Sequence, residues 1–126
     1  MRGKTVNWTE LLPYIQKGNV QSTLFIGRVT EPEDLGPYLV GMANTCGGSL
    51  VVGIDVRSFH LFGTQIDQEW VDQLIFEYCL PGLSCQVEQI SRGGKQIAFI
   101  SIEESQHKPH YFNRKSYIID AATCMP

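Results

Sequence analysis

The sequence lacks the long hydrophobic runs that a membrane-spanning helix requires. Its first residues include no apolar segment behind a positively charged stretch, so no signal peptide is predicted and we expect an intracellular, cytoplasmic protein. Four cysteines occur without a Cys-x-x-Cys pair, which disfavours a structural zinc site. We expect these thiols to be reduced and mostly buried in the core.

An excess of positive charge is also missing. Ten Lys and Arg residues face 13 Asp and Glu residues, which gives a formal net charge of −3. A protein that neutralises many phosphates usually has a basic face, so any such face here must be local. The motifs of P-loop nucleotide sites, dinucleotide-binding turns and serine-hydrolase elbows are absent as well, and these absences exclude all three at motif level.

The composition that is present is globular, with 43% hydrophobic and 18% charged residues in 126 positions, which suits one domain over residues 1–126. Periodicity and turn signals predict an order of alternating elements, followed by a cluster of strands. Helices are expected over residues 8–17, about 30–46 and 66–78, and strands over 23–29, 49–56, 84–90 and 96–102, with short hairpin strands at 59–62, 111–112 and 116–119. The fold class is α/β or α+β, with a mixed sheet, two main helices and a short N-terminal helix.

Three local signals refine these elements. Asn7 is expected to cap the first helix. Residues 30–33 resemble a capping box that opens the second helix, and Pro37 either kinks that helix or marks its true start. Cys46, beside two glycines, could be a nucleophile at a turn, but buried packing is the favoured prediction.

The most distinctive string is Ala-Asn-Thr-Cys-Gly-Gly at residues 43–48, followed by a buried strand that ends in Gly53-Ile54-Asp55. The glycines permit a tight turn, and Asn44 could fix either that turn or a ligand. Asp55 lies at the carboxyl end of a strand, where open sheets often place functional groups. The alternative is purely local: a helix C-cap at Gly47-Gly48 and a turn at Asp55.

This string resembles the Schlafen AlbA-like domain family, whose order of elements the chain follows from about residue 21 to residue 123. The resemblance implies a compact AlbA-like fold and a nucleic-acid-binding or nucleotide-binding module, as in bacterial transcriptional regulators. DNA or RNA is then the expected partner, ATP or Mg²⁺ a candidate cofactor, and a homodimer or a protein partner a further expectation. A C-terminal region removed from the chain, or a separate partner, would fit its lack of a second domain.

In Schlafens this domain cleaves RNA through a cluster of carboxylates, and the resemblance equates one of them with Asp55. The others fall on Val20 or Gln21 and on Phe25, and a later arginine of the family falls on Ile119. A metal-assisted nuclease needs several carboxylates to hold Mg²⁺. A binding module is therefore favoured over a divergent metal-dependent RNase, and a scaffold or dimerisation domain without a ligand site is a third hypothesis.

The segment 107–115 contains the densest local mixture of basic and aromatic residues. Such a mixture suits phosphate contacts with base stacking, although an ordinary solvated hairpin is the favoured alternative. Its histidines, with Glu103 and Glu104, could in principle ligate a metal, but the spacing is unspecific. The residues predicted to bind nucleic acid or a nucleotide are Asn44, Thr45, Gly47, Gly48, Asp55, Lys108, Arg114 and Lys115.

Overall fold

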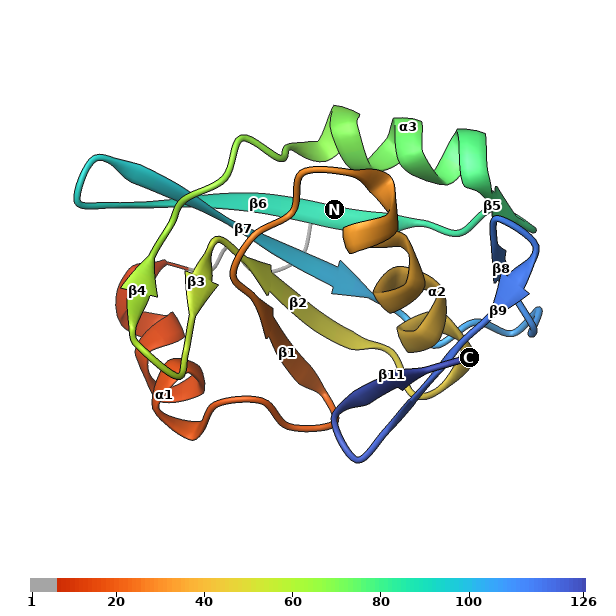
Figure 1. The fold of residues 1–126 in the computed structure, drawn as a ribbon, viewed down its shortest axis with the longest axis horizontal. Coiled ribbons are helices and arrows are strands. Elements are labelled where there is room, and N and C mark those ends of the chain that lie inside the picture. Colours follow the sequence, from red (N-terminus) through yellow and green to blue (C-terminus); the bar gives the residue numbers. More distant parts are fainter. Residues whose placement is uncertain (1–6) are drawn as a thin grey trace.

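A four-stranded mixed sheet lies at the centre of the computed structural model, which describes residues 7–126 (Figure 1). Its strands are β1 (Thr23–Ile26), β2 (Gly48–Val52), β6 (Cys85–Arg92) and β7 (Lys95–Ile102), in the order β1-β2-β7-β6. The pair β1–β2 is parallel and the other pairs are antiparallel, so the sheet is mixed as predicted. The fold is α+β.

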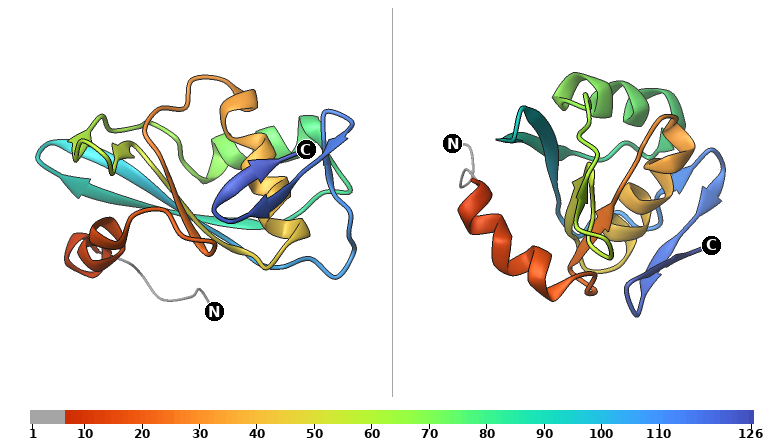
Figure 2. Two further views of the ribbon diagram at one scale, coloured as in Figure 1. Left: turned by 60° about the horizontal axis from the view of Figure 1, so that its bottom comes forward. Right: turned by 60° about the vertical axis from the view of Figure 1, so that its left-hand side comes forward.

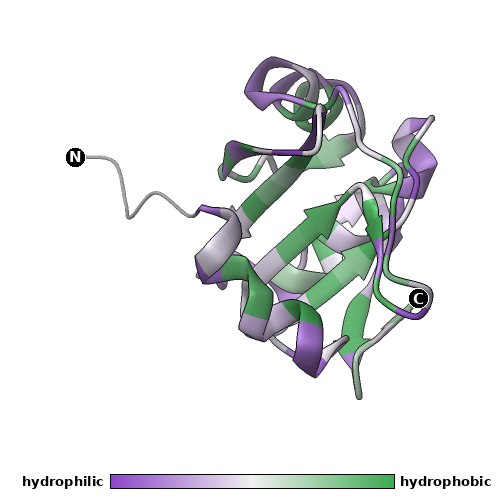
Figure 3. Cartoon of the chain, turned by 90° about the vertical axis from the view of Figure 1, so that its left-hand side faces the viewer, coloured by the Kyte–Doolittle hydropathy of each residue, from purple (hydrophilic) through white to green (hydrophobic). Residues whose placement is uncertain are grey.

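Helices cover both faces of this sheet. The helices α2 (Gly36–Asn44) and α3 (Gln68–Tyr78) pack on one face, and α1 (Trp8–Lys17) packs on the other (Figure 2). Alternate residues of β2 serve the two cores, because Leu50 and Val52 join the cluster under α2 and α3, whereas Val51 joins the cluster under α1. Apolar residues accordingly dominate the central strands, while the helices carry polar residues on their outer sides (Figure 3).

The helix starts follow the capping chemistry of the sequence. Asn7 caps α1 as predicted, since its Oδ1 accepts a hydrogen bond from the Glu10 amide at 2.9 Å. Pro37 lies in the first turn of α2, so it marks a start rather than a kink. None of the described helices is long and apolar enough to cross a membrane.

The capping box predicted over residues 30–33 is displaced by one residue, with Glu31 as N-cap and Asp34 as its partner. A short 3₁₀ helix, η1 (Pro32–Asp34), precedes α2, and the carboxylate of Asp34 rather than Glu33 turns back onto the chain. It accepts hydrogen bonds from the backbone amides of Thr30 and Glu31, which lower the pKa of Asp34. The box begins one residue later because Pro32, which has no backbone N–H, takes the first position of η1 and makes Glu31 the N-cap.

Short strand pairs surround the sheet. They are β3 (Ile54–Asp55) with β4 (His60–Leu61), β5 (Cys79–Leu80) with β8 (Tyr111–Phe112) and β9 (Lys115–Ser116), and β10 (Ile118–Asp120) with β11 (Thr123–Met125). The strand predicted over 49–56 is divided at Gly53, whose φ of 112° and close approach to Gly63 bend the chain. The strand predicted over 23–29 ends at Ile26, and β11 was not predicted.

All four cysteines are free, as expected, but they differ in exposure. Cys79 and Cys85 are buried, and burial raises the pKa of the first thiol to about 11 and of the second to about 12. Cys124 is partly buried, with a pKa raised by burial to about 11. The prediction that Cys46 is buried is wrong, because it lies exposed in the turn between α2 and Gly47.

We expect a thiol reagent at pH 8 to label the native protein rapidly at one position, Cys46, and the other thiols at least 100-fold more slowly. The raised pKa values keep those thiols neutral and unreactive, and packing blocks access. The free energy of unfolding should fall as pH rises from about 9 towards 12, because the unfolded thiols lose protons first. Stopped-flow labelling of wild type and Cys46→Ser checks this, and a second rapid thiol would contradict it.

Candidate functional site

The structure separates the residues predicted to form one site. The turn at residues 44–48 and the segment 107–115 lie at the end where α2 finishes, whereas Asp55 lies at the other end of β2 and β3 (Figure 1). The strand path runs from Gly48 to Asp55, and a strand advances about 3.3 Å per residue, so roughly 20 Å divides the two ends. No single small ligand bridges that distance.

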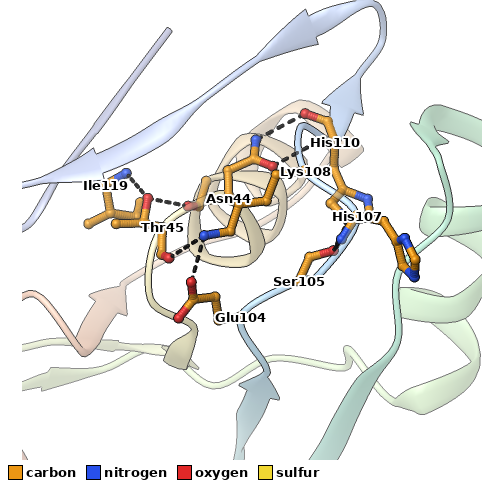
Figure 4. A network of polar contacts seen from close by, with 9 residues as sticks. Asn44, Thr45, Glu104, Ser105, His107, Lys108, His110 and Ile119 are labelled. Atoms are coloured by element: carbon orange, nitrogen blue, oxygen red, sulfur yellow. Dashed lines mark hydrogen bonds and ion pairs between the residues drawn. The ribbon is translucent and has the colours of Figure 1, made fainter.

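Asn44 is the centre of the first group (Figure 4). Its Oδ1 accepts a hydrogen bond from the backbone amide of His110 at 2.7 Å. Its Nδ2 lies 3.0 Å from the His110 carbonyl, 2.9 Å from the Tyr117 carbonyl and 3.2 Å from the Ser116 hydroxyl. Both hydrogens of the amide and one lone pair of its oxygen are therefore used within the fold, where Asn44 holds the C-terminal segment against α2.

Thr45 continues this role one residue later. Its hydroxyl donates to the Gly41 carbonyl at 2.8 Å and accepts from the Ile119 amide at 2.9 Å, which ties β10 to the end of α2. We call Asn44 and Thr45 together the C-terminal clamp.

The lysine expected to contact phosphate is also occupied. Lys108 Nζ donates to the Thr45 carbonyl at 3.2 Å and forms an ion pair with the Glu104 carboxylate at 2.6 Å. A cation beside the last carbonyls of a helix stabilises that helix, because it faces the negative end of the helix dipole. The exposed Arg114 belongs to the two-residue turn between β8 and β9, and Lys115 begins β9.

The paired glycines serve backbone packing. At Gly47, with φ 70°, an added Cβ would lie 2.6 Å from the Glu104 amide nitrogen. At Gly48 it would lie 2.5 Å from the Ser22 carbonyl oxygen. The distinctive string is thus explained by the fold, since two neighbouring backbones approach where only glycine fits.

His110 is buried, at 2% exposure, at the inner wall of a cavity of about 720 Å³ that Glu104, Ser105 and His107 also line. Its Nδ1 faces the Pro81 carbonyl at 2.8 Å, so that nitrogen carries the proton, and Nε2 accepts from the Ser105 hydroxyl. Both ring nitrogens are therefore engaged within the fold. Among the described residues, no group of three or more His, Cys, Asp or Glu side chains could hold a metal ion.

The positions equated with the Schlafen carboxylates have other tasks. Gln21 donates through Nε2 to the Ile119 carbonyl at 2.6 Å and accepts from the Ala122 amide at 3.0 Å, so it secures the β10–β11 hairpin. Phe25 packs in the core under α1. The Asp55 carboxylate accepts from the Arg57 amide at 3.0 Å and the Ser58 hydroxyl at 3.2 Å. These residues do not fit a Mg²⁺ site, which needs several oxygen ligands around one point.

A second cluster, which the sequence did not predict, lies at the Asp55 end. Its members are the exposed cations Arg28, Arg57, Arg92 and Lys95, which we call the basic end. Figure 1 shows β3, β4 and the turn between β6 and β7 gathered at this end of the molecule, and the left view of Figure 2 shows the same grouping.

Contacts with neighbouring groups hold three members of the basic end. The Arg28 guanidinium lies 4.6 Å from the centre of the Phe62 ring, and Lys95 Nζ donates to the Leu61 carbonyl at 3.0 Å. Arg92 pairs with Lys95 across the β6–β7 turn and stacks over the Trp8 ring at 5.2 Å. Aromatic contacts hold an arginine without neutralising it.

The charges of the basic end are uncompensated within the described part of the chain, where the one ion pair is that of Lys108 with Glu104. No local pattern could have revealed this cluster, because its members come from three separate segments of the sequence. The one feature that these four residues share in the sequence is weak: each lies at the end of a strand or within two residues of it.

We expect Asn44→Ala to lower the free energy of unfolding by about 2 to 4 kcal/mol, because several backbone groups of the C-terminal segment lose their partner at once. Urea denaturation measures this. Gln106→Ala, at an exposed neighbour of the same segment, is the control and should change stability by less than about 0.5 kcal/mol. Equal, small effects of both variants would show that the clamp does not hold the segment.

Comparison with solved structures supports the fold. The crystal structure of the DIP2311 protein from Corynebacterium diphtheriae matches 84% of this chain with a TM-score of 0.64 and 23% identity, and this chain spans about a quarter (25%) of that protein. The solution structure of the N-terminal domain of an ATP-dependent DNA helicase RecG-related protein from Nitrosomonas europaea matches 86% of this chain, and 81% of that domain, with a TM-score of 0.63 and 17% identity. None of the curated proteins matches the chain.

The sequence model of the family described as Schlafen, AlbA_2 matches residues 18–125, which covers the clamp, the paired glycines and the basic end. This agrees with the resemblance inferred from residues 43–55. The chain therefore belongs to the Schlafen, AlbA_2 family.

Proposed function

We propose that this protein is a nucleic-acid-binding module that contacts phosphates through the basic end. The observation that carries the proposal is the grouping of Arg28, Arg57, Arg92 and Lys95, all exposed and without ion pairs among the described residues, on a chain of net charge −3. Four cations at one end are the local basic face that phosphate binding requires. Negative charge elsewhere favours approach of a polyanion by this end.

Family membership supports the same proposal, as does the likeness to a domain of a DNA helicase-related protein. We propose further that the module acts inside the cell, in a transcriptional regulator, and that residues 1–126 form one domain. DNA, RNA and a free nucleotide such as ATP offer the same phosphate chemistry, so the test includes all three. Binding without catalysis fits Asp55, whose carboxylate is occupied by its own turn.

The basic end replaces Lys108 as the principal phosphate contact, because Lys108 is held by Glu104 and the Thr45 carbonyl. Arg114 and Lys115 are also exposed and carry the same charges as Arg57 and Lys95. They lie at the other end of the molecule, so their variants serve as controls for those of the basic end. This proposal gives a structural role to four further residues of the predicted site. They stabilise the fold and do not touch the ligand: Asn44, Thr45, Gly47 and Gly48.

Fluorescence anisotropy with labelled DNA and RNA at several salt concentrations tests the proposal, with ATP as competitor. We expect Arg57→Ala and Lys95→Ala each to weaken binding and to reduce the slope of log K against log salt by about 1. Arg114→Ala and Lys115→Ala should leave the slope unchanged. The reverse pattern would move the interface to the β8–β9 turn, and no binding at low salt would contradict the proposal.

A second candidate function, dimerisation, has its own observation. Large apolar side chains are exposed at the C-terminal end of α3 and beside it, with Phe76 at 86%, Leu80 at 74% and Tyr111 at 40% exposure. They line a groove of about 430 Å³ whose charged members are Glu77 and Arg114. One charge of each sign makes the groove complementary to itself, as a two-fold dimer requires. We propose a second copy of the chain as its occupant.

A charge swap tests this dimer. We expect Glu77→Arg and Arg114→Glu each to weaken the dimer about 10-fold or more by like-charge contacts, and the double variant to recover it. Sedimentation velocity over a concentration series provides the measurement, with Phe76→Glu as a disrupting variant and Leu12→Glu as an exposed apolar control. A strict monomer at all concentrations would refute the dimer.

A further inference from the structure

The β3–β4 hairpin holds a phenylalanine at its tip in water. Residues 56–59 connect the two strands, and Phe59 is 65% exposed with φ 57°. Few bulky residues adopt a positive φ, because it brings Cβ close to the backbone. Strain of this kind persists when the surrounding structure imposes it, and it gathers at binding sites.

Asp55 holds the loop on both sides of Phe59. Its carboxylate accepts from the Arg57 amide and the Ser58 hydroxyl, and its backbone pairs with His60 across the hairpin. These bonds restrict the backbone of the loop that carries the ring. A restricted loop loses less conformational entropy when it binds a ligand.

Planar groups continue from the tip into the basic end. The ring centres of His60 and Phe62 are 4.3 Å apart, and the Arg28 guanidinium lies over Phe62 at 4.6 Å. Arg57 is two residues from Phe59 in the same loop. Phe59 is thus the exposed ring of a hairpin that also carries Arg57 and, at its base, the Arg28–Phe62 contact.

Alternating aromatic rings and cations are what an unpaired strand requires, since its bases stack on the rings while its phosphates meet the cations. A duplex keeps its base faces covered by its own stacking, so it could use the cations but not an exposed ring. The larger apolar cluster around Phe76 and Leu80 lies on other elements, α3 and β5, and so Phe59 is not part of a broad protein-type surface.

We propose that the basic end is a site for single-stranded nucleic acid, with an unpaired base stacked on Phe59 and Asp55 as the residue that positions this ring. The inference rests on the proposed nucleic-acid function and narrows its ligand class. It also gives the Gly-Ile-Asp string of the sequence a role without metal: the aspartate shapes the loop that meets the base.

Three labelled probes of equal length separate the contributions: a single strand of 12 nucleotides, a 12-unit abasic strand of the same charge, and the 12-base-pair duplex, which carries twice as many phosphates. We expect the wild-type protein to bind the single strand about 10-fold more tightly than either other probe. Phe59→Ala should weaken single-strand binding by about 5- to 150-fold, with an unchanged salt slope, and leave the other two probes unaffected. Phe59→Trp should retain binding, and Ile118→Ala, at an apolar residue of β10 that is 47% exposed and lies outside both proposed interfaces, should have no effect.

The outcomes distinguish this inference from the function on which it rests. If Phe59→Ala binds the single strand as wild type does, or if the duplex binds as tightly as the single strand, the stacking site is refuted while phosphate binding stands. If wild type binds none of the probes at low salt, the nucleic-acid function fails as well. Circular dichroism of each variant verifies folding. If Phe59→Ala is unfolded, the comparison of Phe59→Trp with Phe59→Leu decides whether an aromatic ring is needed for single-strand binding.

Discussion

The hydrogen bonds of Asn44 are the constraint on which one half of this structure depends. A single partly buried amide at the end of α2 meets both backbone groups of His110 and the carbonyl of Tyr117, and Thr45 adds the amide of Ile119. These contacts fix a segment of irregular chain that has few backbone partners of its own. Gly47 and Gly48 complete the arrangement, because any side chain there would collide with Glu104 or Ser22. The most distinctive string of the sequence thus encodes assembly of the fold.

The consecutive strands β2 and β3 connect this end of the molecule to the basic end, where we propose that ligands bind. β2 begins at the paired glycines and continues through Gly53 into β3 and Asp55, so one buried strand carries the assembly motif at its start and the loop support at its end. The side chain of Asp55 accepts hydrogen bonds from residues of its own loop, whereas that of Asn44 binds backbone groups far away in the sequence. The residues that would touch a ligand are then the ones this loop and its neighbours expose: the cations and Phe59.

Much of the fold could be predicted from the sequence because its signals are local. The cap at Asn7 and the apolar periodicity of α1 and α3 each act within a few residues. The division of the second strand at Gly53 was not predictable, since it depends on Gly63 arriving from another part of the chain. The binding residues predicted from the sequence stay a prediction. The sequence does not show that most hydrogen bonds of Asn44 and Thr45 are made within the fold. The basic end is dispersed over residues 28–95 and becomes visible only after folding.

The central claim is that ligands meet the Asp55 end and not the end with the clamp. Amide chemical-shift mapping during titration with a short single strand tests this most directly. The account predicts progressive shifts for Arg28, for residues 55–62 and for residues 92–95, with the amides of residues 44–48 and 107–115 unmoved. Shifts concentrated at residues 44–48 and 107–115 would contradict it and return the site to the position that the sequence motif first suggested.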